Sequence, residues 1–194
     1  FHATSDSEII AKMIAYYHRG DIEQAVIETM RRIQGAYSLL VLTRRELIGV
    51  RDAYGIRPLS LGRLNNHHYV LASETCALDI VSARLVRDIE PGEMVAIDER
   101  GPRFRQAIPK VRDAMCMFEF IYFARPDSYL YGRLLYTVRH RMGQQLAIEH
   151  PVEADVVIGV PDTAIPAAIG YAKQAGIPYD EGFIKNRYIH RTFI

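Results

Sequence analysis

Two amphipathic helices are predicted at the start of the chain. Apolar residues recur at helical spacing from residue 9 to residue 17, and again from residue 22 to residue 33. Ser5 and Glu8 precede the first run with the spacing of a capping box, while Gly20 can end the first helix and Asp21 can begin the second. The pattern therefore places two consecutive helices ahead of any strand.

Short apolar segments separated by turn residues follow and predict antiparallel strands. We expect these strands at residues 35–42, 46–51, 56–61, 69–72, 85–89 and 94–97, with the first two forming a hairpin. Two prolines and many charges at residues 101–112 predict a loop, with a domain boundary between residues 112 and 113. Helices followed by such strands indicate a layered α+β domain over residues 1–112.

The pattern changes to α/β in the last part of the chain. An aromatic segment at 116–124 has no decisive period, and a helix is predicted at about 134–149. A strand at 154–160, a helix at 164–176 and a second strand near Gly182 then form a βαβ unit. Open α/β sheets bind ligands beyond the carboxyl ends of their strands, so the cations Lys185, Arg187 and Arg191 favour an anion there, with phosphate first.

Composition narrows the functional classes. The 194 residues carry a formal net charge of +1, which argues against a general nucleic-acid binder. No apolar run approaches the roughly 20 residues that cross a bilayer, and no signal peptide opens the chain, so we expect a cytoplasmic protein. Cys76 and Cys116 do not make a disulfide framework, and we expect Cys76 to start a helix and to be buried. The chain begins at Phe1 and reads as an internal fragment.

Five motifs in a fixed order resemble one enzyme family. They are residues 4–8 (Thr-Ser-Asp-Ser-Glu), 52–59 (Asp-Ala-Tyr-Gly-Ile-Arg-Pro-Leu), 72–74 (Ala-Ser-Glu), 122–128 (Tyr-Phe-Ala-Arg-Pro-Asp-Ser) and 185–188 (Lys-Asn-Arg-Tyr). Together they closely resemble the amidophosphoribosyltransferases, also called glutamine phosphoribosylpyrophosphate amidotransferases. The resemblance covers essentially the whole chain, and the last two motifs are the most specific.

The resemblance implies a two-domain, glutamine-dependent enzyme. Residues 1–112 resemble the rear of an αββα glutaminase domain of the N-terminal-nucleophile hydrolase class, and residues 113–194 the start of a type I phosphoribosyltransferase domain. The family passes ammonia from glutamine to phosphoribosyl pyrophosphate (PRPP), making 5-phosphoribosylamine, glutamate and pyrophosphate in the first step of purine synthesis. The resemblance also implies Mg²⁺ and a homo-oligomer, a tetramer in the family. The nucleophilic N-terminal cysteine is absent from this chain, so we expect the fragment alone to be inactive.

Asp6 and Cys116 match functional positions of the family. Asp6 on its own is a carboxylate that favours a helix N-terminus, and the resemblance implies that it binds the α-ammonium of glutamine. Cys116 on its own is a small buried residue, and the resemblance matches it to the first ligand of a [4Fe-4S] cluster that some members carry. Both interpretations of Cys116 stay open. Asp52 and Arg57 are expected to serve turn structure through internal hydrogen bonds.

The turn after the first strand of the βαβ unit resembles a pyrophosphate-binding loop. Asp162 and Thr163 lie in this turn, where backbone amides at a helix N-terminus suit an anion. The alternative is a plain turn in which Thr163 caps the helix. Ala164 replaces the hydroxyl residue that many family members associate with the magnesium site, which makes direct metal contact at that position doubtful.

The last part of the chain resembles a flexible loop that closes over PRPP. The matching residues are Lys185, Arg187, Tyr188 and Arg191, and His190 replaces an expected glycine. A charged loop is otherwise ordinary solvated surface. Tyr136 matches a position near a path for ammonia, although it is expected, like the aromatic residues Phe118, Phe120, Tyr122 and Phe123, to be core material first.

Two other functions stay open. One is a different type 2 glutamine amidotransferase, such as a sugar-phosphate aminating enzyme, against which the motif at 185–188 argues. The other is a non-catalytic PRPP-sensing regulator on the same scaffold. An N-terminal cysteine on the mature protein would favour the enzyme over the sensor.

Overall fold

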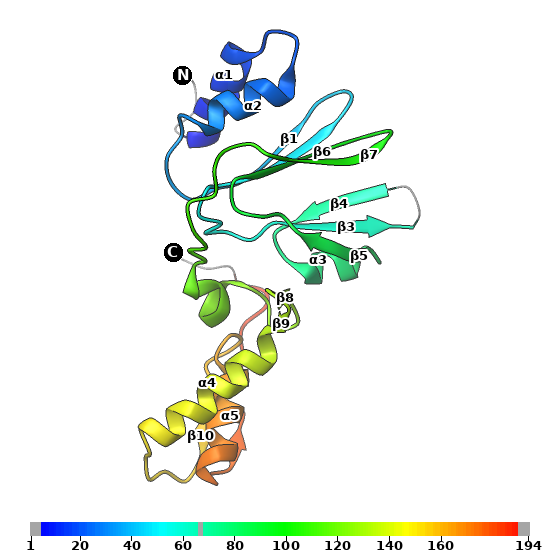
Figure 1. The fold of residues 1–194 in the computed structure, drawn as a ribbon. Helices are drawn as coiled ribbons and strands as arrows, with labels where there is room; N and C mark the ends of the chain where they lie inside the picture. The colour runs from blue at the N-terminus through cyan, green and yellow to red at the C-terminus, as the bar shows by residue number, and fades with distance from the viewer. Residues whose placement is uncertain (1–4, 66–67, 190–194) are drawn as a thin grey trace. The chain divides into compact units, whose positions relative to one another are not determined.

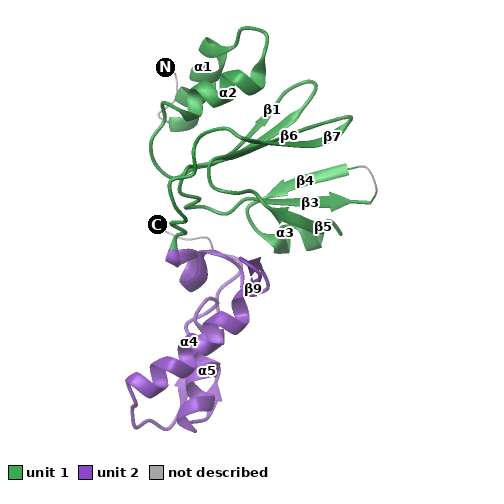
Figure 2. Ribbon diagram, viewed as in Figure 1, with its two compact units in different colours: residues 1–116 green, residues 117–194 purple. Residues whose placement is uncertain are grey.

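The computed structural model describes residues 5–65 and 68–189 and divides the chain into two compact units (Figure 2). Unit 1 comprises residues 1–116, and unit 2 comprises residues 117–194. The boundary between the units along the chain lies between residues 116 and 117, and the sequence predicted it between 112 and 113.

Both predicted N-terminal helices of unit 1 are confirmed, as α1 (Asp6–Tyr17) and α2 (Ile22–Met30). The Ser5 hydroxyl accepts a hydrogen bond from the N–H of Ser7 at 3.3 Å, and the Asp21 carboxylate accepts one from the N–H of Gln24 at 3.0 Å. These side chains satisfy backbone donors that have no partner inside the first turn of a helix. The polar residues that precede each apolar run therefore set where the helices begin.

Two antiparallel sheets make up the middle of unit 1. The first has the order β1-β2-β6-β7 and the second has the order β4-β3-β5. The strands are β1 (Ser38–Leu42), β2 (Leu47–Arg51), β3 (Ser60–Leu64), β4 (His68–Ala72), β5 (Arg84–Asp88), β6 (Glu93–Asp98) and β7 (Gly101–Gln106). The predicted hairpin is confirmed, because β1 pairs antiparallel with β2 and places Leu42 opposite Leu47.

The prediction of a strand at 56–61 was wrong for its first part. β3 starts only at Ser60, because Arg51 holds the preceding segment as a loop. Its guanidinium donates to the carbonyl oxygens of Gly55 and Arg57, both at 2.7 Å. Backbone acceptors that bind a side chain are not available for a sheet ladder at the same time.

The prediction of a loop across residues 101–112 was also wrong in part. Residues 101–106 form β7, which pairs with β6 along its whole length. β7 is an edge strand, and an edge tolerates both Pro102, which lacks an N–H, and the exposed charges of Arg103 and Arg105. Composition alone made this strand look like a linker.

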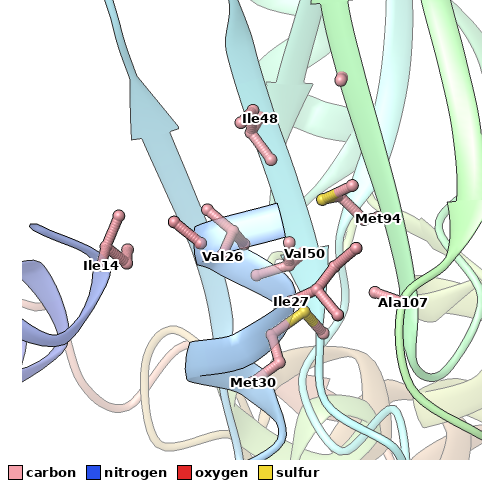
Figure 3. Packing of buried hydrophobic residues seen from close by; sticks show 10 residues of the cluster. Ile14, Val26, Ile27, Met30, Ile48, Val50, Met94 and Ala107 are labelled. Atoms are coloured by element: carbon pink, nitrogen blue, oxygen red, sulfur yellow. The ribbon is translucent and has the colours of Figure 1, made fainter. Parts of the chain in front are cut away.

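Unit 1 is built in four layers in the order helix, sheet, sheet, helix (Figure 1). α1 and α2 cover one face of the first sheet, the second sheet lies against its other face, and α3 (Thr75–Ile80) packs on the second sheet. Figure 3 shows the outer core, whose buried side chains include Val26, Ile27 and Met30 of α2 with Ile48, Val50 and Met94 of the first sheet. Between the sheets lie Leu59, Leu61, Leu71, Ile89 and Val95. As predicted, Cys76 is buried near the start of α3.

Tyr37 packs against the outer core with a hydroxyl that is buried and has no hydrogen-bond partner among the described residues. Burial, with a smaller contribution from the negative charge of Asp52, raises the pKa of Tyr37 from 10.0 to about 12. A buried hydroxyl without a partner costs stability.

We therefore expect Tyr37→Phe to stabilise the protein by about 1 kcal/mol near neutral pH, as measured by urea denaturation. The pKa of Tyr37 is higher in the folded than in the unfolded protein. This difference therefore stabilises the folded protein fully below pH 10, and the stabilisation is lost as the pH rises to about 12. Between about pH 8 and about pH 11, wild-type stability should therefore fall more than that of Tyr37→Phe. A destabilised Tyr37→Phe protein would show instead that the hydroxyl has a partner.

Unit 2 contains the predicted βαβ unit. A hairpin of β8 (Tyr129–Leu130) and β9 (Arg133–Leu134) leads into α4 (Leu135–Glu149), which confirms the predicted helix. β10 (Val157–Ile158) and β11 (Tyr179–Asp180) then pair in parallel across α5 (Ile165–Ala175).

The second strand of this unit is not where the sequence placed it. β11 ends at Asp180, and residues 181–186 have no regular structure, so a strand near Gly182 was wrong. β10 ends at Ile158, which pairs with Asp180, and the chain then turns at residues 161–164. The residues after Asp180 therefore have no facing strand in β10 to pair with.

The aromatic segment forms a short π-helix, η1 (Glu119–Phe123). The expectation that its rings are core material was wrong for most of them. Phe120 is buried, but Phe118, Tyr122 and Phe123 are 58%, 48% and 51% exposed. A single helical turn can bury only one face against α4, so the rings on its other faces remain outside the core of unit 2.

Candidate anion-binding site

Two loops of unit 2 lie at the same edge of its parallel strand pair. Residues 159–164 follow β10, and residues 181–189 follow β11. Because parallel strands end at the same side of a sheet, these loops run next to each other. The predicted site residues Asp162, Thr163, Lys185 and Arg187 all belong to these two loops.

The first loop runs directly into α5. Ala164 is the N-cap residue, and its side chain accepts no hydrogen bond from the first turn of α5. The alternative that Thr163 caps the helix is therefore wrong in this structure. Apart from Pro166, which has no N–H, the first turn of α5 leaves backbone N–H groups without a capping side chain, and with the positive end of the helix dipole these groups favour an anion.

Lys185 and Asp162 connect the two loops. The Lys185 ammonium lies 3.4 Å from the Asp162 carboxylate, and the two side chains are 59% and 67% exposed. An ion pair this exposed contributes little stability, because water and salt screen it. The contact can therefore be exchanged for a phosphate without a large cost to the fold.

Two hollows open on either side of this ion pair. The larger has a volume of about 650 Å³ and lies between η1, α4 and the loop after β10. The smaller has a volume of about 220 Å³ and is lined by residues of both loops, including Arg187 and Glu181. Pro161, Asp162 and Lys185 line both hollows. The Lys185–Asp162 pair thus sits on the wall that the two hollows share.

Sequence reasoning missed Arg139, which lines the larger hollow. Its side chain is buried, and its guanidinium donates to the carbonyl oxygens of Phe120 and Ala124, both at 2.7 Å. A signal was present in the sequence, because Leu135, Arg139, Gly143 and Ala147 form a buried stripe along α4 in which Arg139 is the one charge. An arginine in an otherwise apolar stripe indicates that its buried side chain is paired with polar groups.

The other predicted residues of unit 2 line neither hollow or lie outside the described residues. Tyr188 is 95% exposed, and its N–H donates to the Asn186 side chain at 2.9 Å. Tyr136 lies in the first turn of α4, is 41% exposed and stacks on His140 rather than lining either hollow. Arg191 and the substitution at His190 lie outside the described residues.

The predicted residues of unit 1 form no common site among themselves. Asp6 is exposed in the first turn of α1. Cys116 is partly buried, and its N–H donates to the carbonyl oxygen of Ile56 at 3.1 Å. Asp52 has the expected structural role, since its buried carboxylate accepts the N–H groups of Tyr37, Tyr54 and Ile56.

Within residues 5–65 and 68–189, no group of three or more His, Cys, Asp or Glu side chains is arranged to hold a metal ion. Cys76 and Cys116 are both free cysteines in this structure. Over the same residues, no helix is both long and apolar enough to cross a membrane.

Known proteins resemble this chain over part or all of its length. Residues 1–79, all in unit 1, match a family model described as a glutamine amidotransferase domain. The whole chain is 52% identical over 98% of its length to an amidophosphoribosyltransferase of Synechococcus elongatus, of which it covers 40%. It is 43% identical over its full length to amidophosphoribosyltransferase 1, chloroplastic, of Arabidopsis thaliana, of which it covers 34%.

A solved structure covers both units. Glutamine phosphoribosylpyrophosphate amidotransferase from B. subtilis, complexed with ADP and GMP, superimposes with a TM-score of 0.93 at 44% identity over all of this chain. The chain corresponds to 42% of that protein. Thus it spans well under half the length of the relatives it matches.

Proposed function

We propose that the complete protein, like the amidophosphoribosyltransferases that this chain resembles along its length, uses glutamine and water to convert PRPP into 5-phosphoribosylamine. Glutamate and pyrophosphate are the other products, and the reaction opens purine synthesis. Unit 1 contributes to the glutaminase domain, and unit 2 begins the type I phosphoribosyltransferase domain. Matches over the whole chain at 43–52% identity support this assignment.

In unit 1, Asp6 holds the glutamine substrate. Its carboxylate is exposed at the start of α1, where an ammonium group can approach it from solvent. A carboxylate paired with an α-ammonium gives a charge-assisted hydrogen bond and selects an amino acid over a simple amide. Ser5 caps the helix immediately before Asp6, so the backbone that carries Asp6 is fixed locally.

In unit 2, the edge beyond β10 and β11 holds the pyrophosphate group of PRPP. The observation that carries this proposal is the meeting of Lys185 with Asp162 in front of the uncapped start of α5. Lys185 exchanges its exposed contact with Asp162 for a phosphate oxygen, and Arg187 adds a guanidinium from the same loop. Tyr188 and Arg191 continue the loop that closes over the substrate.

The reaction is a displacement at C1 of the ribose. Ammonia forms the new C1–N bond while the bond from C1 to the pyrophosphate oxygen breaks, and the electron pair leaves with pyrophosphate. Lys185 and Arg187 stabilise the charge that develops on this leaving group. Mg²⁺, when bound, neutralises part of the same charge. It commonly uses few protein oxygens together with substrate phosphates, and Asp162 and Thr163 are the side-chain oxygens that this turn offers.

Three further assignments rest on the family resemblance alone. Tyr136 borders the path of ammonia between the two active sites. Cys116 is the candidate first ligand of a [4Fe-4S] cluster, whose other ligands come from outside the described residues. The complete protein forms a homo-oligomer.

The test is a pair of variants that separate the two half-reactions in the complete protein. Asp6→Asn should raise the KM for glutamine about tenfold or more, because it loses a charged hydrogen bond, while synthesis from free ammonia survives. Lys185→Ala should lower synthesis from either nitrogen source about tenfold, while hydrolysis of glutamine without PRPP is retained. Glutamate and phosphoribosylamine formation are measured separately for each variant.

Each outcome has a defined meaning. Equal loss of both activities in Asp6→Asn would show that Asp6 supports the fold rather than glutamine. A wild-type protein that binds PRPP but makes no phosphoribosylamine would favour the non-catalytic sensor. Synthesis that uses a sugar phosphate in place of PRPP would favour the other amidotransferase class.

A further inference from the structure

Arg139 joins α4 and η1, two elements that line the larger hollow. It lies in the second turn of α4, and its guanidinium reaches across to η1. There it donates to the carbonyl oxygens of Phe120 and Ala124 at 2.7 Å, with a longer contact of 3.5 Å to that of Glu119. One side chain thus binds three backbone acceptors at the start and the end of the π-helix.

The hydrogen bonds from Arg139 provide partners for carbonyl groups that the short π-helix leaves unpaired. Carbonyl groups at the end of a helix have no partner within it, and a helix of a single turn has few internal bonds to hold its shape. A positive charge at a helix C-terminus also complements the helix dipole. The planar fork of a guanidinium can reach two carbonyls in fixed directions, which an ammonium cannot do in the same way.

The position of η1 matters because its outward side chains form one wall of the hollow. Ile121 and Tyr122 line it from η1, Thr163 lines it from the loop after β10, and Ala167 lines it from α5. α4 provides the floor between these walls through Met142, Gly143 and Leu146. Gly143 lies one turn after Arg139 and brings α5 close, since a Cβ there would approach the Ala167 carbonyl oxygen to 1.8 Å. One turn of α4 therefore sets the distance between both walls.

We propose that Arg139 is a positioning residue for the PRPP site, which acts through Ile121 and Tyr122 by holding η1 at a fixed distance from the loop 159–164. Arg139 does not itself take part in the chemistry. The inference rests on the proposed function, because it assigns a role to the wall of the site where pyrophosphate is proposed to bind.

The experiment compares Arg139→Lys with Arg141→Lys in the complete protein. Arg139→Lys keeps the charge and most of the length but loses the fork, whereas Arg141 lies on the same helix with an exposed side chain. We expect Arg139→Lys to lower kcat/KM for PRPP about tenfold to a hundredfold with ammonia as the nitrogen source, because small displacements of a site are costly. Hydrolysis of glutamine without PRPP should stay within about twofold of wild type. Arg141→Lys should match wild type in both assays.

A second measurement separates positioning from general stability. Inhibition by inorganic pyrophosphate reports on the site without turnover, and its inhibition constant should rise in Arg139→Lys together with the KM for PRPP. Unchanged kinetics in Arg139→Lys, beside an active wild-type protein, would overturn the inference and leave the proposed function intact. An equal loss of glutamine hydrolysis and PRPP-dependent synthesis would also overturn it, because that pattern indicates a merely structural arginine. Absence of synthesis in the wild type would instead refute the proposed function.

Discussion

Gly143→Ala is expected to destabilise unit 2 by about 3 kcal/mol or more. In an ordinary helix this change would add about 1 kcal/mol of stability, because alanine has the higher helix propensity. Here a Cβ at residue 143 would lie 1.8 Å from the carbonyl oxygen of Ala167, and the backbone of α5 cannot give way as a side chain can. The reciprocal contact is as close, because a Cβ at Gly170 would lie 2.0 Å from the carbonyl oxygen of His140. α4 and α5 must therefore separate along their shared face.

Thermal or urea unfolding of Gly143→Ala measures this effect. Thr137→Ala is the matched control, since Thr137 is an exposed residue of the same helix and should tolerate alanine. Gly170→Ala should behave like Gly143→Ala. A Gly143→Ala protein at least as stable as the wild type would show that the two helices do not meet at these glycines.

Arg51→Met is expected to cost unit 1 about 3 kcal/mol or more. The arginine side chain is buried and donates to the carbonyl oxygens of Gly55, Arg57 and Ile89 at 2.6 to 2.7 Å. Methionine fills a similar volume but has no donor, so these acceptors lose a charged partner, at about 1–3 kcal/mol for each one left unsatisfied. The loop before β3 would then lose the contacts that shape it.

Arg103→Met is the contrasting control in the same unfolding measurement. Arg103 pairs with three carboxylates, those of Glu23, Glu46 and Asp98, but its side chain is 46% exposed. Exposed ion pairs are screened by water and salt, so we expect a much smaller loss than in Arg51→Met. An equal or larger loss for Arg103→Met would mean that the surface network, rather than the buried fork of Arg51, holds these strands.

The outline of the fold could be predicted from the sequence wherever a local signal was sufficient. Ser5 and Asp21 marked the starts of α1 and α2, because a helix cap involves only neighbouring residues. The helices α4 and α5 were predicted close to their bounds, and Gly176 ends α5 in the left-handed conformation that glycine favours. The grouping of Asp162, Thr163, Lys185 and Arg187 could also be predicted, since a βαβ unit brings both loops to one edge.

The remaining features depended on partners that are distant in the sequence. β7 could not be recognised because an edge strand tolerates the proline and charges of a loop, and only its pairing with β6 defines it. The end of β11 was decided by where β10 stops, and the exposure of the rings in η1 by how little of one turn α4 can cover. Arg51 and Arg139 look like ordinary charged residues in the sequence. Their roles appear only when folding brings backbone carbonyls from distant segments within reach of a single guanidinium, because hydrogen bonds depend on distance in space and not on spacing along the chain.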